Sequence, residues 1–140
     1  MTLVLGYDES PGAEQALRVA VDVAVRLGEP LTLVYGLAPP GGMGEEFGAH
    51  KEALLEIGRR ATARALEVAQ AAGLDAKVEL VVAKPAEALI SVADACDATV
   101  IVVGTSGESP IKSAMLGSTP HKLLQLSTRP VLCVPVDTGQ

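Results

Sequence analysis

The sequence has only two cysteines in 140 residues, and this scarcity already excludes some classes of protein. Cys96 and Cys133 lie far apart in the chain and do not form a CxxC pair. Neither a disulfide framework nor a thiolate metal site is therefore expected. We predict that both residues are thiols in or near the core of a protein that is kept in a reducing cytosol.

Long hydrophobic runs are also missing. The apolar segment from Val19 to Val25 is interrupted by Asp22, and no stretch is long enough to cross a bilayer. The first residues, Met1 to Leu5, lack the basic region of a secretory signal. The sequence therefore predicts a cytoplasmic protein without a membrane segment.

Positive charge is scarce as well. Lysine and arginine number 11 against 17 aspartates and glutamates, which gives a net charge of −6 at pH 7 and a pI of about 4.8. Nucleic acids and anionic membranes are polyanions, and such a surface repels them on average. We therefore expect neither as a partner, and only a local basic pocket would alter this expectation.

What the sequence does contain is an alternation of short apolar runs and amphipathic stretches. Apolar, β-branched runs predict strands buried on both faces, with the most polar of them nearest a sheet edge. The predicted strands are Thr2–Tyr7, Leu31–Tyr35, Lys77–Val82, Ala98–Val103 and Val131–Val134. The predicted helices lie between Pro11 and Gly28, Leu54 and Gly73, Pro85 and Asp97, and Pro120 and Leu126, with Ser10 as the first cap and Leu37–Gly48 as a connection. The alternation predicts a single α/β domain over residues 1–140, with a parallel sheet covered by helices on both faces.

The strand order can be predicted from connection rules. Right-handed crossovers and central placement of the most apolar strands favour an open five-stranded sheet with the order 3-2-1-4-5. Ligands of such sheets bind where the winding direction reverses, at the carboxyl ends of strands 1 and 4. These ends are Tyr7-Asp8-Glu9-Ser10 and Gly104-Thr105-Ser106-Gly107. We therefore expect the functional site between these two loops.

The loop after the fourth strand carries three spaced glycines, Gly104, Gly107 and Gly117. The first two allow backbone amides to approach a phosphate and to adopt positive φ, and the third precedes a helix whose amides and dipole favour an anion. Structural roles are the alternative, with turns at the first two glycines and Ser118 or Thr119 capping a helix that Pro120 opens. We favour phosphate binding because these residues gather at the predicted switch point.

The glycine spacing differs from the two common nucleotide motifs. A Walker A sequence would need Gly-Lys-Ser/Thr, and no GxGxxG follows the first strand. The pattern present is Gly-x2-Gly-x9-Gly-Ser, formed by Gly104, Gly107, Gly117 and Ser118. Together with "VLGYDES" near the start and "RPVLCVP" near the end, it closely resembles the universal stress protein family, specifically its ATP-binding branch. The resemblance covers essentially the whole chain and implies a Rossmann-like fold of the adenine nucleotide alpha hydrolase type.

The resemblance implies a site for ATP or another adenine nucleotide. Asp8 approaches the nucleotide, and a ribose hydroxyl or a bridging Mg²⁺ is its expected partner because a carboxylate repels phosphate. Gly36 contacts adenine through its backbone in such a site, and helix capping is the alternative role for Asp8. The implied binding residues are Gly6, Tyr7, Asp8, Gly36, Val103, Gly104, Gly107, Gly117, Ser118 and Thr119.

Three residues depart from the family's pattern. Ser106 stands where relatives often carry a basic or imidazole side chain, and acidic Glu108 lies close behind it. Pro120 replaces a common hydroxyl and removes one amide donor. Lys112 could restore positive charge, with simple solvation as the alternative. These departures bear on triphosphate binding more than on adenine binding.

Three functions are compatible with such a site, and the sequence favours the first. It is a regulatory nucleotide-binding protein that acts in the stress response by changing partners or oligomeric state, as the resemblance implies. The second is a slow ATPase or phosphotransfer enzyme. The candidate residues for catalysis would be Glu9, Glu108 and His121, but no motif supports them, so no catalytic residue is predicted. The third is a structural dimerising module with a vestigial pocket.

The last predicted strand suggests an oligomer contact. Val131–Val134 is a short apolar run at the sheet edge, and an unpaired apolar edge invites another strand. The resemblance implies a homodimer in which two such strands pair antiparallel about a two-fold axis. Pro130 and Pro135 bracket the run, and the alternative is that they keep the chain monomeric. We favour the dimer because these prolines leave the middle amides free.

Overall fold

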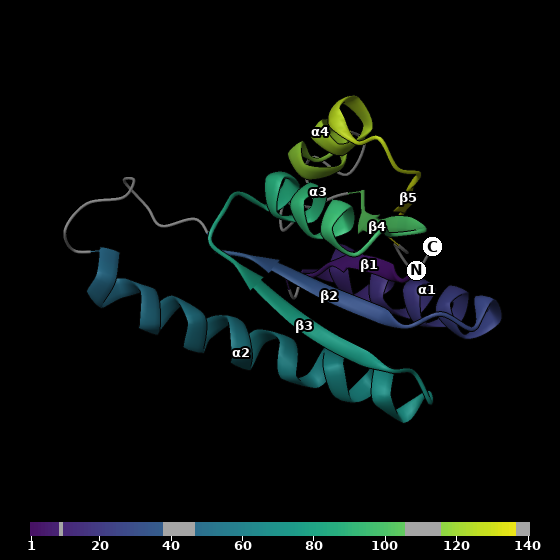
Figure 1. Cartoon of the computed structure of the whole chain (residues 1–140), viewed down its shortest axis with the longest axis horizontal. Helices are drawn as coiled ribbons and strands as arrows, with labels where there is room; N and C mark the ends of the chain where they lie inside the picture. The colour runs from purple at the N-terminus through teal and green to yellow at the C-terminus, as the bar shows by residue number, and fades with distance from the viewer. Residues whose placement is uncertain (9, 38–46, 106–115, 137–140) are drawn as a thin grey trace.

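The computed structural model describes residues 1–8, 10–37, 47–105 and 116–136, which alternate between strands and helices (Figure 1). The strands are β1 (Leu3–Gly6), β2 (Leu31–Gly36), β3 (Ala76–Val81), β4 (Val100–Gly104) and β5 (Val131–Val134). The helices are α1 (Pro11–Leu27), α2 (Phe47–Ala71), α3 (Pro85–Ala95) and α4 (Ser118–Leu126). Adjacent strands are all parallel, in the order β3-β2-β1-β4-β5. The predicted parallel sheet and its strand order are confirmed.

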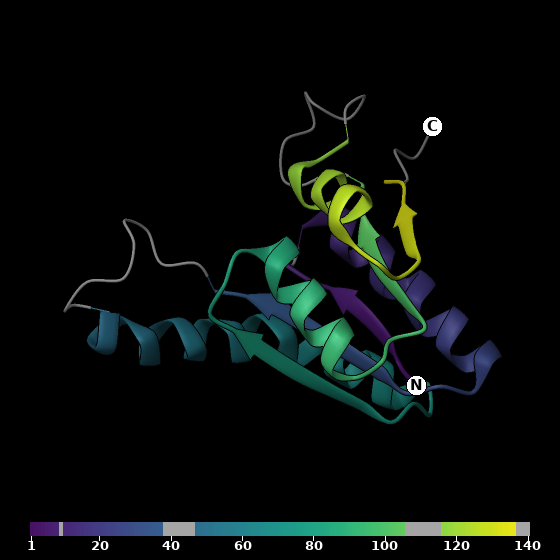
Figure 2. The same ribbon diagram turned by 45° about the horizontal axis from the view of Figure 1, so that its top comes forward.

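The helices form one layer on each face of the sheet. α1 and α2 cover one face, and α3 and α4 cover the other (Figures 1 and 2). Leu3 and Leu5 of β1 pack with residues of α1 and α2, whereas Val4 between them packs with residues of α3 and α4. All three side chains are fully buried. Because a central strand is buried on both faces, its sequence is a continuous apolar run.

Both ends of α1 are formed by the residues that the sequence predicts. Ser10 is the N-cap, and its Oγ accepts a hydrogen bond from the Ala13 N–H at 3.2 Å. Pro11 occupies the first helical position, where its missing N–H costs nothing. Gly28 ends the helix in the left-handed region, with φ of 68°. The helix therefore starts close behind β1, at the carboxyl end of the sheet.

The start of α2 differs from the prediction. The helix begins at Phe47, well before the predicted start at Leu54, and so includes the end of the segment Leu37–Gly48 that was predicted as a connection. The apolar spacing that indicates the helix begins only at Leu54. The residues before it include Gly48, His50 and Lys51, which carry no apolar stripe.

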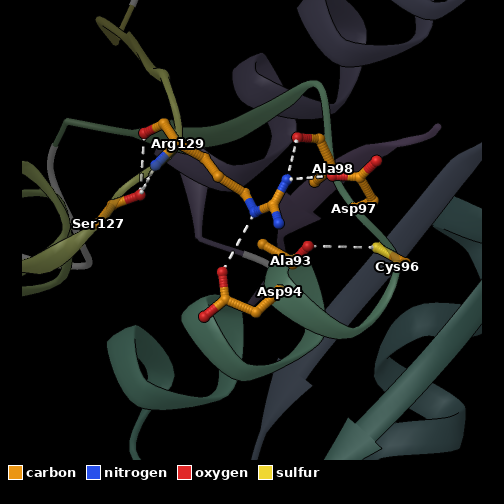
Figure 3. A network of polar contacts seen from close by, with 7 residues as sticks. All are labelled: Ala93, Asp94, Cys96, Asp97, Ala98, Ser127 and Arg129. Carbon is orange, nitrogen blue, oxygen red and sulfur yellow. Dashed lines mark hydrogen bonds and ion pairs between the residues drawn. The ribbon is translucent and has the colours of Figure 1, made fainter.

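A cluster of polar contacts at the amino ends of β4 and β5 ties the last strand to α3 (Figure 3). Arg129 Nε donates to Asp94 Oδ1 at 3.1 Å, and its Nη1 donates to Asp97 Oδ1 at 2.9 Å and to the Ala98 carbonyl at 3.0 Å. Ser127 Oγ accepts from the Arg129 N–H and donates to the carbonyl of the same residue. This cluster lies at the end of the sheet opposite to the carboxyl ends of the strands.

The two cysteines are free thiols with half-buried side chains, in accord with the prediction. Cys133 lies in β5, where burial raises the pKa of its thiol. Within the described ranges, the structure contains no helix that is both long and apolar enough to cross a membrane.

Candidate functional site

A pocket of about 320 Å³ opens at the carboxyl ends of β1, β2 and β4, between the starts of α1, α3 and α4. β1 and β4 are the strands between which the winding direction reverses, so the pocket lies at the predicted switch point. Each implied binding residue in the described ranges lines it: Gly6, Tyr7, Asp8, Gly36, Val103, Gly104, Gly117, Ser118 and Thr119. A cavity of this size suits a small organic ligand.

One wall of the pocket is apolar, and two glycines shape it. Val34 of β2 contributes to this wall together with Pro85 and Leu89 of α3. A Cβ on Gly36 would lie 3.0 Å from Pro85 Cα, and a Cβ on Gly6 would lie 2.9 Å from Leu89 Cδ1. Both glycines therefore allow the start of α3 to lie directly against the strand ends.

Gly104 has a packing role that the sequence did not predict. A Cβ on Gly104 would lie 2.7 Å from both the carbonyl carbon and the carbonyl oxygen of Gly12 in α1. The positive φ that a glycine would allow at this position is not adopted, because the glycines with positive φ in the described ranges are Gly28 and Gly73. Gly104 is thus needed for the close approach of α1 to β4, and it also lines the pocket.

The start of α4 supplies backbone donors, although the amide of Gly117 is not one of them. Gly117 is the N-cap with φ of −63°, so the predicted helix start at Pro120 is wrong, and so is the alternative in which Ser118 or Thr119 caps the helix. Its N–H already donates to the Thr105 carbonyl at 2.7 Å. The N–H groups of Ser118 and Thr119 have no hydrogen-bond partner among the described residues. This helix start therefore offers two amides and the positive end of its dipole to a ligand.

Asp8 is the one charged side chain among the described residues that line the pocket. It is exposed, and its Oδ1 accepts a hydrogen bond from the Ser10 N–H at 3.0 Å. Because Ser10 itself is the N-cap, Asp8 holds the turn before α1 rather than capping the helix. In the described ranges no three His, Cys, Asp or Glu side chains gather as a metal site. Asp8 could hold a cation only together with oxygens of a ligand.

Tyr7 also lines the pocket, but its hydroxyl is already engaged. It donates to Glu14 Oε1, and Arg64 of α2 donates to Glu14 Oε2. Burial and the hydrogen bond with Glu14 raise the pKa of Tyr7 to about 12. Burial acts to raise the pKa of Glu14, but the hydrogen bonds from Arg64 and Tyr7 outweigh it and lower that pKa below 4.5. The hydroxyl proton of Tyr7 is therefore engaged, and a ligand could use this group only as an acceptor.

Some candidate residues cannot be placed in the pocket. Glu9, Ser106, Gly107, Glu108 and Lys112 lie outside the described residues. The binding role of Gly107 and the effects of its neighbours stay predictions. His121 lies in the first turn of α4, is exposed, and does not line the pocket.

The contribution of α3 to the pocket was not predicted from the sequence. The additional lining residues are Ser10, Ala13, Val34, Tyr35, Pro85, Leu89 and Pro120. Pro85 and Leu89 follow β3, which is an edge strand. The switch-point rule points only to the loops after the first and fourth strands. The available signal was Pro85 at the start of a predicted helix, because helices that follow parallel strands all start at one edge of the sheet.

The sheet is parallel and doubly wound, with a pocket at its switch point and three helix starts around that pocket. This arrangement is typical of α/β proteins that hold a small ligand at the strand ends. Residues 1–135 match the model of the Universal stress protein family. The chain belongs to this family.

Individual relatives resemble the chain over nearly its whole length. A universal stress protein of Thermus aquaticus, encoded in the QAH/OAS sulfhydrylase 3′ region, is 35% identical over 137 residues, which cover 95% of this chain and 97% of the relative. A universal stress protein solved in complex with cAMP is 28% identical, with a TM-score of 0.72 and coverage of 98% of each chain. One from Archaeoglobus fulgidus, solved in complex with dAMP, is 26% identical with a TM-score of 0.73, covering 95% of this chain and 96% of that one.

Proposed function

We propose that this protein binds an adenine nucleotide in the pocket at the switch point. The observation that carries the proposal is that one pocket has an apolar wall, formed by β2 and α3, and two amides at the start of α4 that have no partner among the described residues. A nucleotide needs both features, because its base is apolar on its faces and its phosphates are anions. The two solved relatives in complex with cAMP and dAMP support the choice of an adenine nucleotide.

The geometry suggests how the ligand lies. The base would pack against Val34, Pro85 and Leu89, where Gly36 presents its backbone. The phosphates would lie at the start of α4, where the Ser118 and Thr119 amides can donate to them. The ribose would then lie between these two parts of the pocket.

Among adenine nucleotides, we propose ATP with Mg²⁺. Asp8 carries a negative charge into the pocket lining, and bare phosphates would be repelled by it. A magnesium ion removes this conflict, because it is commonly held by one or two carboxylates together with phosphate oxygens. Asp8 is the lining residue that would take part, and a ribose hydroxyl is its other possible partner.

We propose that the nucleotide regulates rather than reacts. The described lining residues include the Asp8 carboxylate and several hydroxyls, but no histidine or lysine that could activate a hydroxyl as a nucleophile. Turnover is therefore expected to stay far below the typical enzyme value of about 10 per second. Occupancy would act by changing partners or oligomeric state in the cytoplasm, in keeping with the family's link to stress.

We further propose that the chain forms a homodimer through β5. In the described sheet this strand pairs with β4 on one side and has no strand on the other. Leu132 in its middle is 37% exposed, so its side chain is accessible to a second copy. Antiparallel pairing with a second copy would satisfy the open edge and cover this side chain.

Calorimetric titration of the purified chain tests nucleotide binding directly. ATP with Mg²⁺ is expected to bind at one site per chain, and GTP, the control, should bind more weakly because its base differs. AMP and cAMP, titrated in parallel, show whether the additional phosphates contribute. Absence of heat and of thermal stabilisation with every adenine nucleotide at millimolar concentration would refute the proposal.

A substitution at the start of α4 tests the location of the site. In Gly117→Val, the Cβ would lie 3.3 Å from the Thr105 carbonyl oxygen, and the branched side chain would occupy space beside the amides. The φ of −63° suits any residue, so the fold should persist while binding is lost. Ala72→Val is the control, because it introduces the same branched side chain at an exposed site beyond the other end of the sheet. Unchanged affinity in folded Gly117→Val would place the phosphates elsewhere.

A further inference from the structure

Three side chains connect the pocket to a helix that does not line it. Tyr7 follows β1, Glu14 lies in the first turn of α1, and Arg64 lies in the middle of α2. The Glu14 carboxylate joins the other two, accepting from Tyr7 on Oε1 and from Arg64 on Oε2. α2 contributes none of the described residues that line the pocket.

Tyr7 and Glu14 are the two ends of the segment that forms one side of the pocket. Tyr7, Asp8, Ser10 and Ala13 all line the pocket. Within the segment, the Ser10 N–H donates to Asp8, the Ala13 N–H donates to Ser10 Oγ, and the Glu14 N–H donates to the Ser10 carbonyl at 3.0 Å. The hydrogen bond between Tyr7 and Glu14 closes this segment from end to end.

We propose that Glu14 and Arg64 are positioning residues for the ligand, holding the segment from Tyr7 to Glu14 in the conformation that binds nucleotide. The proposal rests on the proposed function and assigns to this site two residues that do not line it. Arg64 restrains one carboxylate oxygen of Glu14, which keeps the other directed at the Tyr7 hydroxyl.

The three side chains differ in exposure, and this difference explains why loss of Arg64 should affect the segment. Tyr7 is 4% exposed, and Glu14 is the acceptor that the described residues offer its hydroxyl. The Glu14 side chain is 28% exposed and can turn to solvent once Arg64 no longer holds it. A buried hydroxyl without an acceptor is unfavourable, and the segment would shift to satisfy it. Apparent affinity then falls in proportion to the fraction of molecules that keep the binding conformation.

Substitutions along this connection should therefore weaken ATP binding. Arg64→Met, Glu14→Ala and Tyr7→Phe should each raise the Kd by about three- to tenfold, which corresponds to the net value of one hydrogen bond. Glu14→Gln should recover most of the loss in Glu14→Ala, because the amide oxygen can still accept from Tyr7. The double variant Tyr7→Phe with Arg64→Met should bind no more weakly than the weaker single variant, since both break the same connection.

A second measurement separates positioning from general stability. The amide signal of Ser10 in nitrogen–proton correlation NMR reports the turn in which Ser10 donates to Asp8. Arg64→Met should move this signal in the absence of nucleotide, although Arg64 is exposed and its loss should leave the fold intact. Arg60→Met is the matched control, because Arg60 lies one turn earlier in α2 and pairs with Glu56 at 3.3 Å instead. It should change neither the signal nor the affinity.

The outcomes distinguish this inference from the proposed function. If the unmodified chain binds ATP but Arg64→Met binds equally well, or leaves the Ser10 signal in place, positioning by Arg64 is overturned and nucleotide binding stands. If the unmodified chain binds no adenine nucleotide, the proposed function fails. The Ser10 signal then decides alone whether Arg64 holds the segment, and an unmoved signal refutes it.

Discussion

Gly104 of β4 and Gly12 of α1 are in backbone contact, so close that a Cβ on Gly104 would lie 2.7 Å from the Gly12 carbonyl carbon and oxygen. Real Cβ atoms essentially never approach other atoms this closely. The contact brings the start of α1 against the end of β4, the two elements that flank the switch point. It holds these two elements together beside the pocket, which Gly104 lines.

Adding one methyl group at this contact should lower the stability of the fold. Gly104→Ala is expected to destabilise the fold by about 1 to 3 kcal/mol, because backbone atoms of α1 must move to make room. It should also weaken nucleotide binding. Chemical denaturation measures the first effect, and titration calorimetry measures the second.

Gly58→Ala is the matched control for that substitution. A Cβ on Gly58 would lie 2.8 Å from Leu80 Cδ2, which is the flexible end of a side chain and can turn aside. Gly58 lies inside α2, where alanine is favoured over glycine by about 0.5 to 1 kcal/mol. The control should be neutral or stabilising. Equal stability of the two variants would show that the contact between Gly104 and Gly12 imposes no constraint.

The ionisation of Tyr7 gives a pH-dependent test. Its pKa is raised to about 12 by burial and by the hydrogen bond with Glu14. The folded state thus binds this proton more tightly than the unfolded state, whose value is near 10. The resulting stabilisation is present in full below pH 10 and is lost as the pH rises from 10 to 12.

Tyrosinate absorbance measures this ionisation, because the chain has two tyrosines and no tryptophan. The late step near pH 12 should be missing in Tyr7→Phe. If both proteins titrate identically, the Tyr7 hydroxyl is not buried against Glu14. Far-ultraviolet circular dichroism at each pH serves to show that the chain remains folded during the titration.

The cluster around Arg129 should contribute to stability and not to binding. Arg129→Met removes donors to Asp94, Asp97 and the Ala98 carbonyl, and it should lower Tm by several degrees with little change in ATP affinity. Arg26→Met is the control, since Arg26 pairs with Asp22 on the surface and its side chain is 77% exposed. An equal Tm for the two variants would mean that the cluster adds nothing beyond a surface ion pair.

The proposed dimer can be tested at Leu132. Leu132→Asp should yield monomers in light scattering at tens of micromolar, because it places like charges close together across a two-fold contact. Val134 is unsuitable for this purpose, since it is only 4% exposed and belongs to the core. Ile57→Asp, at a 55% exposed position on α2, should leave the mass unchanged. A monomer mass for the unmodified chain would refute the dimer.

The architecture was predictable from the sequence because it depends on local patterns. The apolar run in β1 and the cap at Ser10 each occur within a few neighbouring residues, and connection rules then led to the order of the strands. The same reasoning placed Asp8 and Gly104 at one pocket. The predicted start of α2 was wrong because no apolar stripe marks the first residues of this helix.

The tertiary structure alone decided what the individual site residues do. The sequence suggested that Gly104 lets backbone amides approach a phosphate, whereas in the structure its missing Cβ allows the close approach of Gly12. It did not show that the Gly117 amide is already bonded to Thr105. The partner of Glu14 lies 50 residues away in Arg64. Such contacts arise when helices pack on the sheet and bring distant residues together, and no local pattern encodes them.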